Sequence, residues 1–581
     1  MTISEALEIV RARIPNEQPY EIALGCSFTP LHLQTFLAAH CKLRKPALNI
    51  AIRPGIFGDL VGTIDGALER QSAQAIAVII EWQDIDRRFG YREAGNWGQA
   101  LESDLVPSLP EACGRIESAI VHAASAVSVA VSLPTLPFPP AFHTPPLQSS
   151  ETELLIRQEI AGLAARLSAK RNIGMISPDW LAAETPMSGR LDVKSDLLIG
   201  SPYTLRHADV LASGLARLLF PPQPLKGIIT DLDDTFWNGI LGEVGPEAVC
   251  WDAASSYQLH GLYQRMLCAL VDAGVLVAVA SKNDPAMVEE AFKRKDLLIP
   301  GTKIFPIEAH WAPKSESVAR ILNAWNISAD SVAFVDDAPL ELAEVANAHP
   351  GIVCLQFPTG DYNGVLALLY RMRDMFGRSR LTDEDKLRLD SIRKSTAFRK
   401  ESEQAGSDDF LAHVQAAITL DHDVSPANPR ILELINKTNQ FNLNGIRFTA
   451  SEWERKLAEP KSFLMAVKYE DKFGPLGTIA VVQGHESEHE LQVETWVMSC
   501  RAFSRRIEHQ CLRAMFERFQ VSQVEFRFVP TPRNGPAGDF FAVFLGAVPS
   551  DCFVLTRRQF DARCPALYHR VEQVTGVNAN G

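Results

Sequence analysis

The chain has 581 residues, of which 46% are hydrophobic, and a formal net charge of −13 at pH 7. This length is too great for one ordinary domain, so we expect three domains with sizeable cores. The acidic balance argues against a general role on nucleic acid or at a membrane surface.

Residues 1–20 show no signal-peptide pattern, and no apolar run is long enough to predict a membrane span. The ten cysteines are scattered without C-x-x-C spacing. This pattern is typical of free thiols in a reducing compartment, so we expect a cytoplasmic protein.

Residues 1–218 alternate apolar, strand-like runs with helical stretches, which predicts an α/β domain. We expect strands at 21–25, 47–52, 76–80 and 126–133, helices at 4–10, 31–39 and 153–167, and an irregular proline-rich connection at 133–146.

The turn from Gly25 to Thr29, directly after the first strand, resembles the nucleophile block of SGNH-type hydrolases, which implies that Ser27 is a nucleophile. The D-x-x-H expected near the end of such a domain is missing: His207 is a possible partner, but Thr204 stands three residues before it. Because no acid orients this imidazole, Ser27 is weakly activated. We therefore expect a degenerate domain that positions a partner, with an active hydrolase as the alternative. For Cys26 we favour a packed thiol over a reactive one.

A second domain is expected at 225–378, after the proline-rich stretch 221–224. Its first strand, 227–230, ends in three acids within four positions, among them Asp231 and Asp233. Like charges this close repel unless a cation or charged substrate compensates. Carboxylates at the carboxyl end of a parallel strand lie where open α/β sheets bind ligands. Taken alone, the motif is also compatible with a solvated acidic turn.

Three later segments favour a site over a solvated turn. The strand 275–280 is followed by Ser281-Lys282-Asn283-Asp284, a helix opens near Lys314, and the strand 331–335 ends in Asp336-Asp337. The alternation of strands and helices predicts a doubly wound parallel sheet, in which all these groups share one edge. Phosphoryl transfer needs such a set: a nucleophile, an acid/base, donors for phosphate oxygens and ligands for Mg²⁺.

The order of these motifs resembles the haloacid dehalogenase (HAD) superfamily of phosphatases. The resemblance implies that Asp231 is the nucleophile, Asp233 the general acid/base and Lys314 a charge-neutralising lysine. It implies that Thr235, Ser281 and Asn283 bind the phosphorylated substrate, and that Asp231, Asp233, Asp336 and Asp337 form the Mg²⁺ site. The 50 residues from Asp231 to Ser281 leave room for a flap and one helix, but not for a large cap domain. That helix is predicted at 259–273, with Leu259 and Leu262 on its apolar stripe.

Residues 379–407 are highly charged and predict a solvated linker helix. Residues 408–581 begin with helices, continue with strands at 462–467, 476–482 and 491–498, and then form a helix at 505–519, with Cys511 on its inner face. This α+β order resembles acetyltransferases of the GNAT type, which bind a coenzyme pyrophosphate at a helix N-terminus.

The turn before that helix lacks the glycines of the resemblance, because Ser504 and Arg506 occupy their positions. We expect Arg501, Arg505 and Arg506 to hold phosphates electrostatically instead. These cations and the helix start would lower the pKa of the Cys500 thiol. Cys500, rather than Cys26, is therefore our candidate for a catalytic, acyl-carrying thiol, and a packed cysteine is the alternative.

The chain as a whole resembles the FkbH-like glyceryltransferase/phosphatase family of polyketide pathways. The matching stretches are 231–243, 281–284, 334–339, 433–443, 498–501 and 530–534. Ala338 and Leu342 depart from the family, which commonly has Asn and Arg there. The resemblance implies that a D-glyceryl unit passes from 1,3-bisphosphoglycerate to the phosphopantetheine thiol of an acyl carrier protein, with loss of both phosphates.

Two other functions are open at this point. One is a stand-alone Mg²⁺-dependent phosphatase of small phosphoesters whose flanking domains set specificity. The other is a scaffold that binds carrier proteins and has inactive sites. The intact D-x-D-x-T at 231–235 argues against the scaffold.

Overall fold

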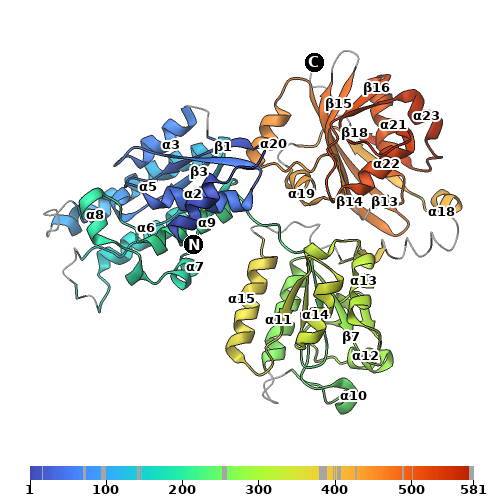
Figure 1. The fold of residues 1–581 in the computed structure, drawn as a ribbon, viewed down its shortest axis with the longest axis horizontal. Coiled ribbons are helices and arrows are strands. Elements are labelled where there is room, and N and C mark those ends of the chain that lie inside the picture. Colours follow the sequence, from blue (N-terminus) through green and yellow to red (C-terminus); the bar gives the residue numbers. More distant parts are fainter. Residues whose placement is uncertain are drawn as a thin grey trace. The chain divides into compact units, whose positions relative to one another are not determined.

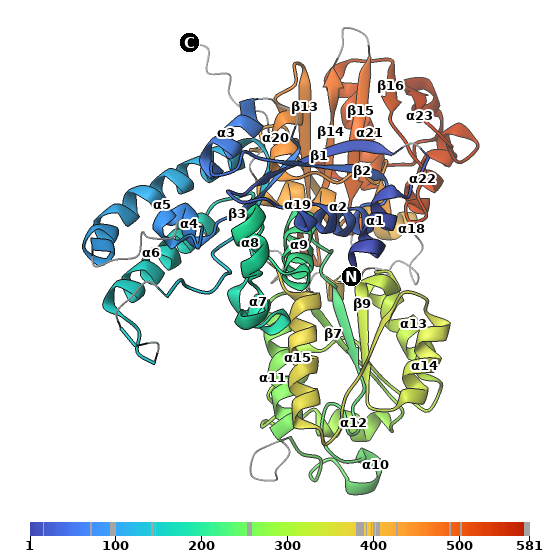
Figure 2. The same ribbon diagram turned by 60° about the vertical axis from the view of Figure 1, so that its left-hand side comes forward.

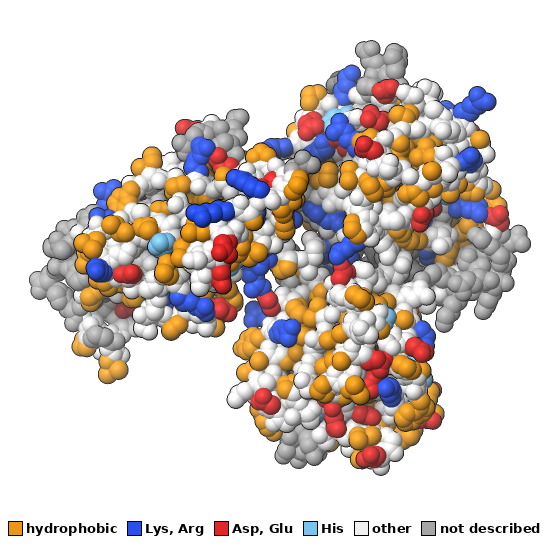
Figure 3. All heavy atoms as spheres, in the orientation of Figure 1, with side chains coloured by type: hydrophobic (Ala, Val, Ile, Leu, Met, Phe, Trp, Pro, Cys, Tyr) orange, Lys and Arg blue, Asp and Glu red, His pale blue; other side chains and the backbone are white. Residues whose placement is uncertain are grey.

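The computed structural model describes the chain except residues 16, 70–72, 93–99, 141–143, 146, 252–257, 379–388, 391, 395, 397, 399–400, 402–406, 426–427, 487–489, 500–501 and 575–581. It contains two compact units (Figure 1). Unit 1 comprises residues 1–222 together with 448–456, and unit 2 comprises 223–447 and 457–581. On the face drawn in Figure 3, acidic and basic side chains are interspersed over each unit.

The first sheet, in unit 1, has the strand order β2-β1-β3-β4-β5, and all its paired strands are parallel. The strands are β1 (Gln18–Gly25), β2 (Leu48–Pro54), β3 (Ala75–Ile79), β4 (Ser128–Ser132) and β5 (Ile173–Met175). One core cluster joins this sheet to α3 (Leu60–Glu69), α5 (Ala100–Ala126) and α6 (Glu151–Ser168). Another joins it to α1 (Ile3–Arg11), α2 (His32–Arg44) and α9 (Leu205–Leu219). Helices on both faces explain why β3 is buried along its whole length.

The second sheet, in unit 2, has the order β10-β9-β6-β7-β8, and its strands are likewise parallel. They are β6 (Gly227–Thr230), β7 (Leu276–Ser281), β8 (Ile307–Ala309), β9 (Val332–Asp336) and β10 (Val353–Gln356). Figure 2 shows α11 (Gln258–Asp272) and α15 (Tyr362–Phe376) on one side of the sheet, and α13 (Lys314–Trp325) and α14 (Pro339–Ala348) on the other. This is the doubly wound parallel sheet that the sequence predicts. Between β6 and α11 the described chain contains the four-residue helix α10 (Leu241–Val244).

Helix α11 differs in detail from its predicted stripe. Leu262 is 41% exposed, whereas Tyr263 is fully buried beneath the sheet. The rest of the predicted stripe holds, since Leu259, Leu267 and Leu270 are buried, so the prediction is wrong only in choosing Leu262 over the neighbouring Tyr263.

The third sheet, also in unit 2, is a mixed eight-stranded sheet with the order β17-β16-β15-β14-β13-β11-β18, and β12 pairs with β15. Its strands are β11 (Ala417–Asp421), β12 (Phe441–Asn442), β13 (Ser462–Asp471), β14 (Gly474–Glu486), β15 (Leu491–Met498), β16 (Gln523–Phe526), β17 (Phe553–Thr556) and β18 (Arg570–Val574). The helices include α19 (Pro429–Lys437) and α21 (Ile507–Phe519). The α+β order of this region agrees with the prediction.

Much of the predicted linker helix, 379–407, lies outside the described residues. Two of its described side chains contradict a purely solvated linker. Ile392 is 3% exposed and packs in the same core cluster as α13, and Phe398 is fully buried in the core of the third sheet. Among the described residues, no helix is both long enough and apolar enough to cross a membrane.

Candidate active site

The predicted catalytic groups meet at the carboxyl edge of the second sheet. Asp231 directly follows β6, Ser281 ends β7 and Asp336 ends β9. Lys314 is the first residue of α13, which follows β8. Parallel pairing of β6 with both β7 and β9 brings these strand ends to one edge. The sequence predicted this convergence because each motif closes a strand or opens a helix.

Lys314 lies between two buried carboxylates. Its Nζ is 2.6 Å from Oδ2 of Asp336 and 3.0 Å from Oδ1 of Asp231. Burial raises the pKa of Asp231 to about 7, although the Lys314 charge opposes the shift. Burial acts against the charge on Lys314, but both carboxylates outweigh it and raise the pKa of the amine. The arrangement is a nucleophile candidate held beside a fixed positive charge.

Three carboxylates are arranged to hold a metal ion. Oxygens of Asp231, Asp336 and Asp337 all lie within 4.8 Å of one another. Oδ1 of Asp231 is buried and, among the described residues, makes no hydrogen bond of good geometry. An all-oxygen set of this kind fits Mg²⁺.

Asp233, the fourth acid of the predicted Mg²⁺ set, is not part of this group of three carboxylates. Its Oδ1 accepts hydrogen bonds from Nε1 of Trp237 and the backbone N–H of Leu241, each at 3.1 Å. Its Oδ2 accepts one from Nδ2 of Asn283 at 3.0 Å, and the same amide donates to Oγ of Ser281. The carboxylate is thus fixed at the same edge without being part of the metal cluster. Asn283 links it to the serine.

Thr235, for which the resemblance implies a phosphate-binding role, contacts Asp337. Its Oγ1 accepts a hydrogen bond from the backbone N–H of Asp337 at 3.0 Å and lies 3.4 Å from Oδ1 of that residue. The side chain is fully buried. In this structure Thr235 therefore orients one acid of the metal site.

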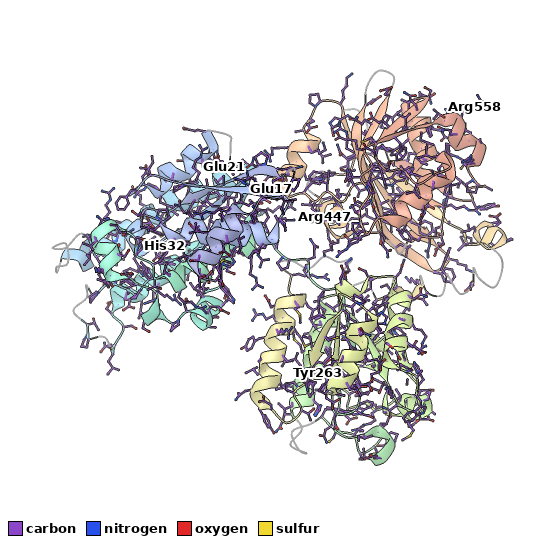
Figure 4. The ribbon with its side chains drawn as sticks, viewed as in Figure 1. Glu17, Glu21, His32, Tyr263, Arg447 and Arg558 are labelled. Atoms are coloured by element: carbon purple, nitrogen blue, oxygen red, sulfur yellow. The ribbon has the colours of Figure 1, made fainter. Side chains whose placement is uncertain are left out.

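Tyr263, labelled in Figure 4, is linked through Thr230 to the backbone of Asp231 and was missed by sequence reasoning. Its hydroxyl donates to Oγ1 of Thr230 at 3.0 Å, and Thr230 in turn donates to the backbone carbonyl of Asp231 at 2.8 Å. Burial raises the pKa of Tyr263, so the phenol keeps its proton and stays a donor. The available signal was a polar aromatic residue on the inner face of an otherwise aliphatic helix.

No family model and no curated protein matches the chain. Among solved structures, it is similar to the N-terminal part of protein BF1531 from Bacteroides fragilis, which contains a phosphatase domain and was solved in complex with Mg. The two share 16% identity at a TM-score of 0.52, over 66% of this chain and 100% of that chain. This likeness shows a shared fold.

Two other solved structures match with lower TM-scores, and nothing is inferred from them. An uncharacterized protein from Corynebacterium glutamicum matches with 18% identity and a TM-score of 0.19, over 26% of this chain and 98% of that one. The salicylyl-acyltransferase SsfX3 from a tetracycline biosynthetic pathway matches with 14% identity and a TM-score of 0.23, over 36% of this chain and 55% of that one.

In unit 1, His207 is not placed to activate Ser27. Its ring nitrogens Nε2 and Nδ1 lie 3.0 and 3.1 Å from the hydroxyls of Thr135 and Thr185. Burial lowers the pKa of His207 to about 3, so the ring is neutral and enclosed. Ser27 instead accepts a hydrogen bond from Nε2 of Gln83 at 3.1 Å. The possible Ser27–His207 pair is therefore wrong, because the imidazole faces a threonine pair.

The residues predicted around the candidate thiol are only partly described by the structure. Cys500 and Arg501 lie outside the described residues, so their predicted roles stay predictions. Arg505 is 2% exposed, with its Nε 3.3 Å from Oδ2 of Asp471 and its guanidinium over the ring of Phe398. Arg506 pairs with Asp408 and donates to a backbone carbonyl. Burial of Arg505 contradicts its expected role in holding phosphates, whereas the expected role of Arg506 stays a prediction.

Cys26 and Cys511 are packed thiols. Burial raises the pKa of Cys26 to about 12, and Cys26 is 2% exposed. Burial also raises the pKa of Cys511, which lies in the core as predicted. Neither thiol forms a thiolate readily near neutral pH.

Proposed function

We propose that the carboxyl edge of the second sheet is the active site of a Mg²⁺-dependent HAD-type phosphatase. The observation that carries this proposal is the buried contact of Lys314 with Asp231 and Asp336, beside the carboxylate group that includes Asp337. A stable fold gains little from two buried acids around one lysine, with a third acid beside them, since each buried charge is costly to desolvate. Such a set of side chains can bind a divalent cation and a phosphorylated substrate.

The described side chains fit a two-step reaction. An oxygen of Asp231 forms a bond to phosphorus while the ester P–O bond breaks, and the leaving alkoxide takes a proton from Asp233. Water then attacks the phosphorus, returns a proton to Asp233, and releases phosphate with Asp231 restored. Lys314 stabilises the negative charge of the transferred phosphoryl group, and Asn283 keeps Asp233 in position. Mg²⁺ held by Asp231, Asp336 and Asp337 would neutralise the phosphate oxygens.

We infer that the physiological reaction joins this phosphatase to transfer of a D-glyceryl, or related acyl, unit onto the thiol of an acyl carrier protein. The support is the resemblance of stretches 231–243 and 433–443 to the FkbH-like family. The chemistry is also coherent: an acyl phosphate is already activated for attack by a thiol, and the phosphate ester that is left needs a phosphatase. The phosphorylated three-carbon donor would then lose both phosphates.

A stand-alone phosphatase of small phosphoesters is the second candidate. The internal contacts of Arg505 favour it, because they remove one of the expected phosphate-holding groups from the acetyltransferase-like region. Intact mass spectrometry of a carrier protein, incubated with enzyme, Mg²⁺ and acyl phosphates, separates the two candidates. A mass increase of one acyl unit supports transfer, whereas phosphate release at full rate without a carrier supports the plain phosphatase.

The acyl-carrying thiol is tested in the same assay. We expect Cys500→Ala to prevent an acyl adduct on the enzyme and Cys26→Ala to leave it intact. An adduct that persists in Cys500→Ala would rule out that thiol, and a peptide map would then show the residue that carries it.

A further inference from the structure

Unit 2 contains a cavity of about 110 Å³ that no part of the proposed phosphatase uses. It is lined by Lys226 and by the C-terminal end of α13, including Trp325, and on the other side by one face of α19 and the segment after it. One water needs only about 10–15 Å³ of such space, so the cavity has room for a small organic molecule.

The cavity lies at the opposite edge of the second sheet from the phosphatase site. Lys226 precedes β6 and Asp231 follows it, so the two residues are separated by the length of that strand. At about 3.3 Å per residue, this distance is roughly 16 Å. A small ligand in the cavity cannot touch Asp231, so the cavity is a separate site.

Three basic side chains line this cavity: Lys226, Arg430 and Lys437. Nζ of Lys226 donates to the backbone carbonyl of Lys437 at 3.1 Å. Glu433 lies between the other two, with its oxygens 3.1 Å from Nη1 of Arg430 and 2.5 Å from Nζ of Lys437. These contacts fix the cations around one space. Cations gathered in this way favour an anion whose several oxygens can accept from more than one of them.

The uncharged residues of the lining indicate two further properties of the ligand. Oε1 of Gln440 is buried and, among the described residues, has no hydrogen-bond partner. A ligand hydroxyl would satisfy it, and an unsatisfied acceptor costs about 1–3 kcal/mol. Trp325 and Leu434 supply an apolar wall for a short carbon chain.

This lining also gives a role to a stretch of sequence that has none in the proposed phosphatase site. The stretch 434–443 resembles the FkbH-like family more specifically than the phosphatase motifs do, and Leu434, Lys437 and Gln440 come from it. We propose that the cavity binds a small hydroxylated organic phosphate, at a site separate from the phosphatase centre and formed by Lys226, Arg430, Lys437 and Gln440.

Isothermal titration with glycerol 3-phosphate tests this site in the full chain. The background is Asp231→Asn, which prevents turnover, and a chelator removes Mg²⁺ from the phosphatase centre. We expect binding that persists in chelator and weakens about tenfold or more in Lys226→Met and in the nearly isosteric Gln440→Glu. Lys226→Arg should retain binding, as should the matched control Lys170→Met on the exposed surface of unit 1.

A further variant separates the two phosphate sites. Lys314→Met, in the phosphatase centre, should leave the chelator-resistant binding unchanged if the cavity holds the ligand. Loss of all binding in chelator would overturn the proposal. So would binding that disappears in Lys314→Met but survives in Lys226→Met. Circular dichroism of each variant shows whether a loss reflects unfolding, and Gln440→Glu, which changes no backbone contact, then decides the result. Phosphate release by the unaltered enzyme tests the phosphatase independently of all these outcomes.

Discussion

Replacement of Lys314 by methionine should destabilise unit 2 through the two carboxylates that it leaves behind. With Nζ at 3.0 Å from Asp231 and 2.6 Å from Asp336, each attraction is about 5–6 kcal/mol at an effective dielectric constant of about 20. Desolvation of the three charges offsets most of this attraction. Because methionine keeps the length of the side chain but not its charge, the acids lose their partner, and such a loss typically costs about 3–5 kcal/mol.

Urea unfolding of the full chain measures this cost. The two units can unfold in separate steps, so we expect the transition of unit 2 alone to move. Mg²⁺ should recover part of the lost stability in Lys314→Met, since it offers the same acids another cation. Lys303→Met is the matched control: Lys303 pairs with Asp272 at the surface, and we expect a change of about 1 kcal/mol or less. Equal shifts in both variants would refute the argument that Lys314 compensates buried acids.

Three further outcomes are expected. His207 has a pKa of about 3, below its ordinary value of 6.5, so it supplies stability that is full above pH 6.5 and is lost as the pH falls. As the pH falls from 7 to 5, the free energy of unfolding of His207→Gln should therefore rise by up to about 2 kcal/mol relative to that of the parent, measured by urea melts. Parallel pH profiles of the two proteins would contradict this. Gly227→Ala would place a Cβ 2.5 Å from the ring of Trp325, so we expect about 1–3 kcal/mol of destabilisation by calorimetry, and an unchanged transition would be evidence against this packing. Thr235→Val removes the hydroxyl that holds Asp337, so Mg²⁺ affinity measured by titration should fall about tenfold or more, and unaltered affinity would remove Thr235 from the metal site.

The carboxyl edge of the second sheet was predictable because its signals are local. The runs 227–230, 275–280 and 331–335 are apolar without alternation, as strands covered on both faces are. Polar residues follow each of them, and parallel pairing must bring those ends together. The positions of Asp231 and Asp336 therefore followed from the pattern alone.

Side-chain partners were less predictable, because they depend on contacts that are distant in sequence. Thr235 bonds a residue that is 102 positions away, and Tyr263 reaches Thr230 across the sheet. The basic turn before α21 predicted a phosphate site, but Arg505 is drawn into the core by Asp471, a partner 34 residues earlier. A run of charges does not show which of them the fold will bury.

The strand β12 illustrates the same limit. Two residues, Phe441 and Asn442, pair with Met498 and Val497 near the end of β15. β15 and β16 pair in parallel over Leu491 to Val493. A two-residue strand has no periodicity from which to predict it, and its pairing is set by the surrounding core.

The most direct test of the central proposal is to trap the phosphorylated enzyme. The full chain, supplied with Mg²⁺ and a small phosphate ester, is quenched in acid and digested, and its peptides are analysed by mass spectrometry. The account predicts an acyl phosphate on Asp231 that is released by hydroxylamine and is absent from Asp231→Asn, which also releases no phosphate. A phosphate on another residue, or turnover by Asp231→Asn at the parent rate, would contradict it.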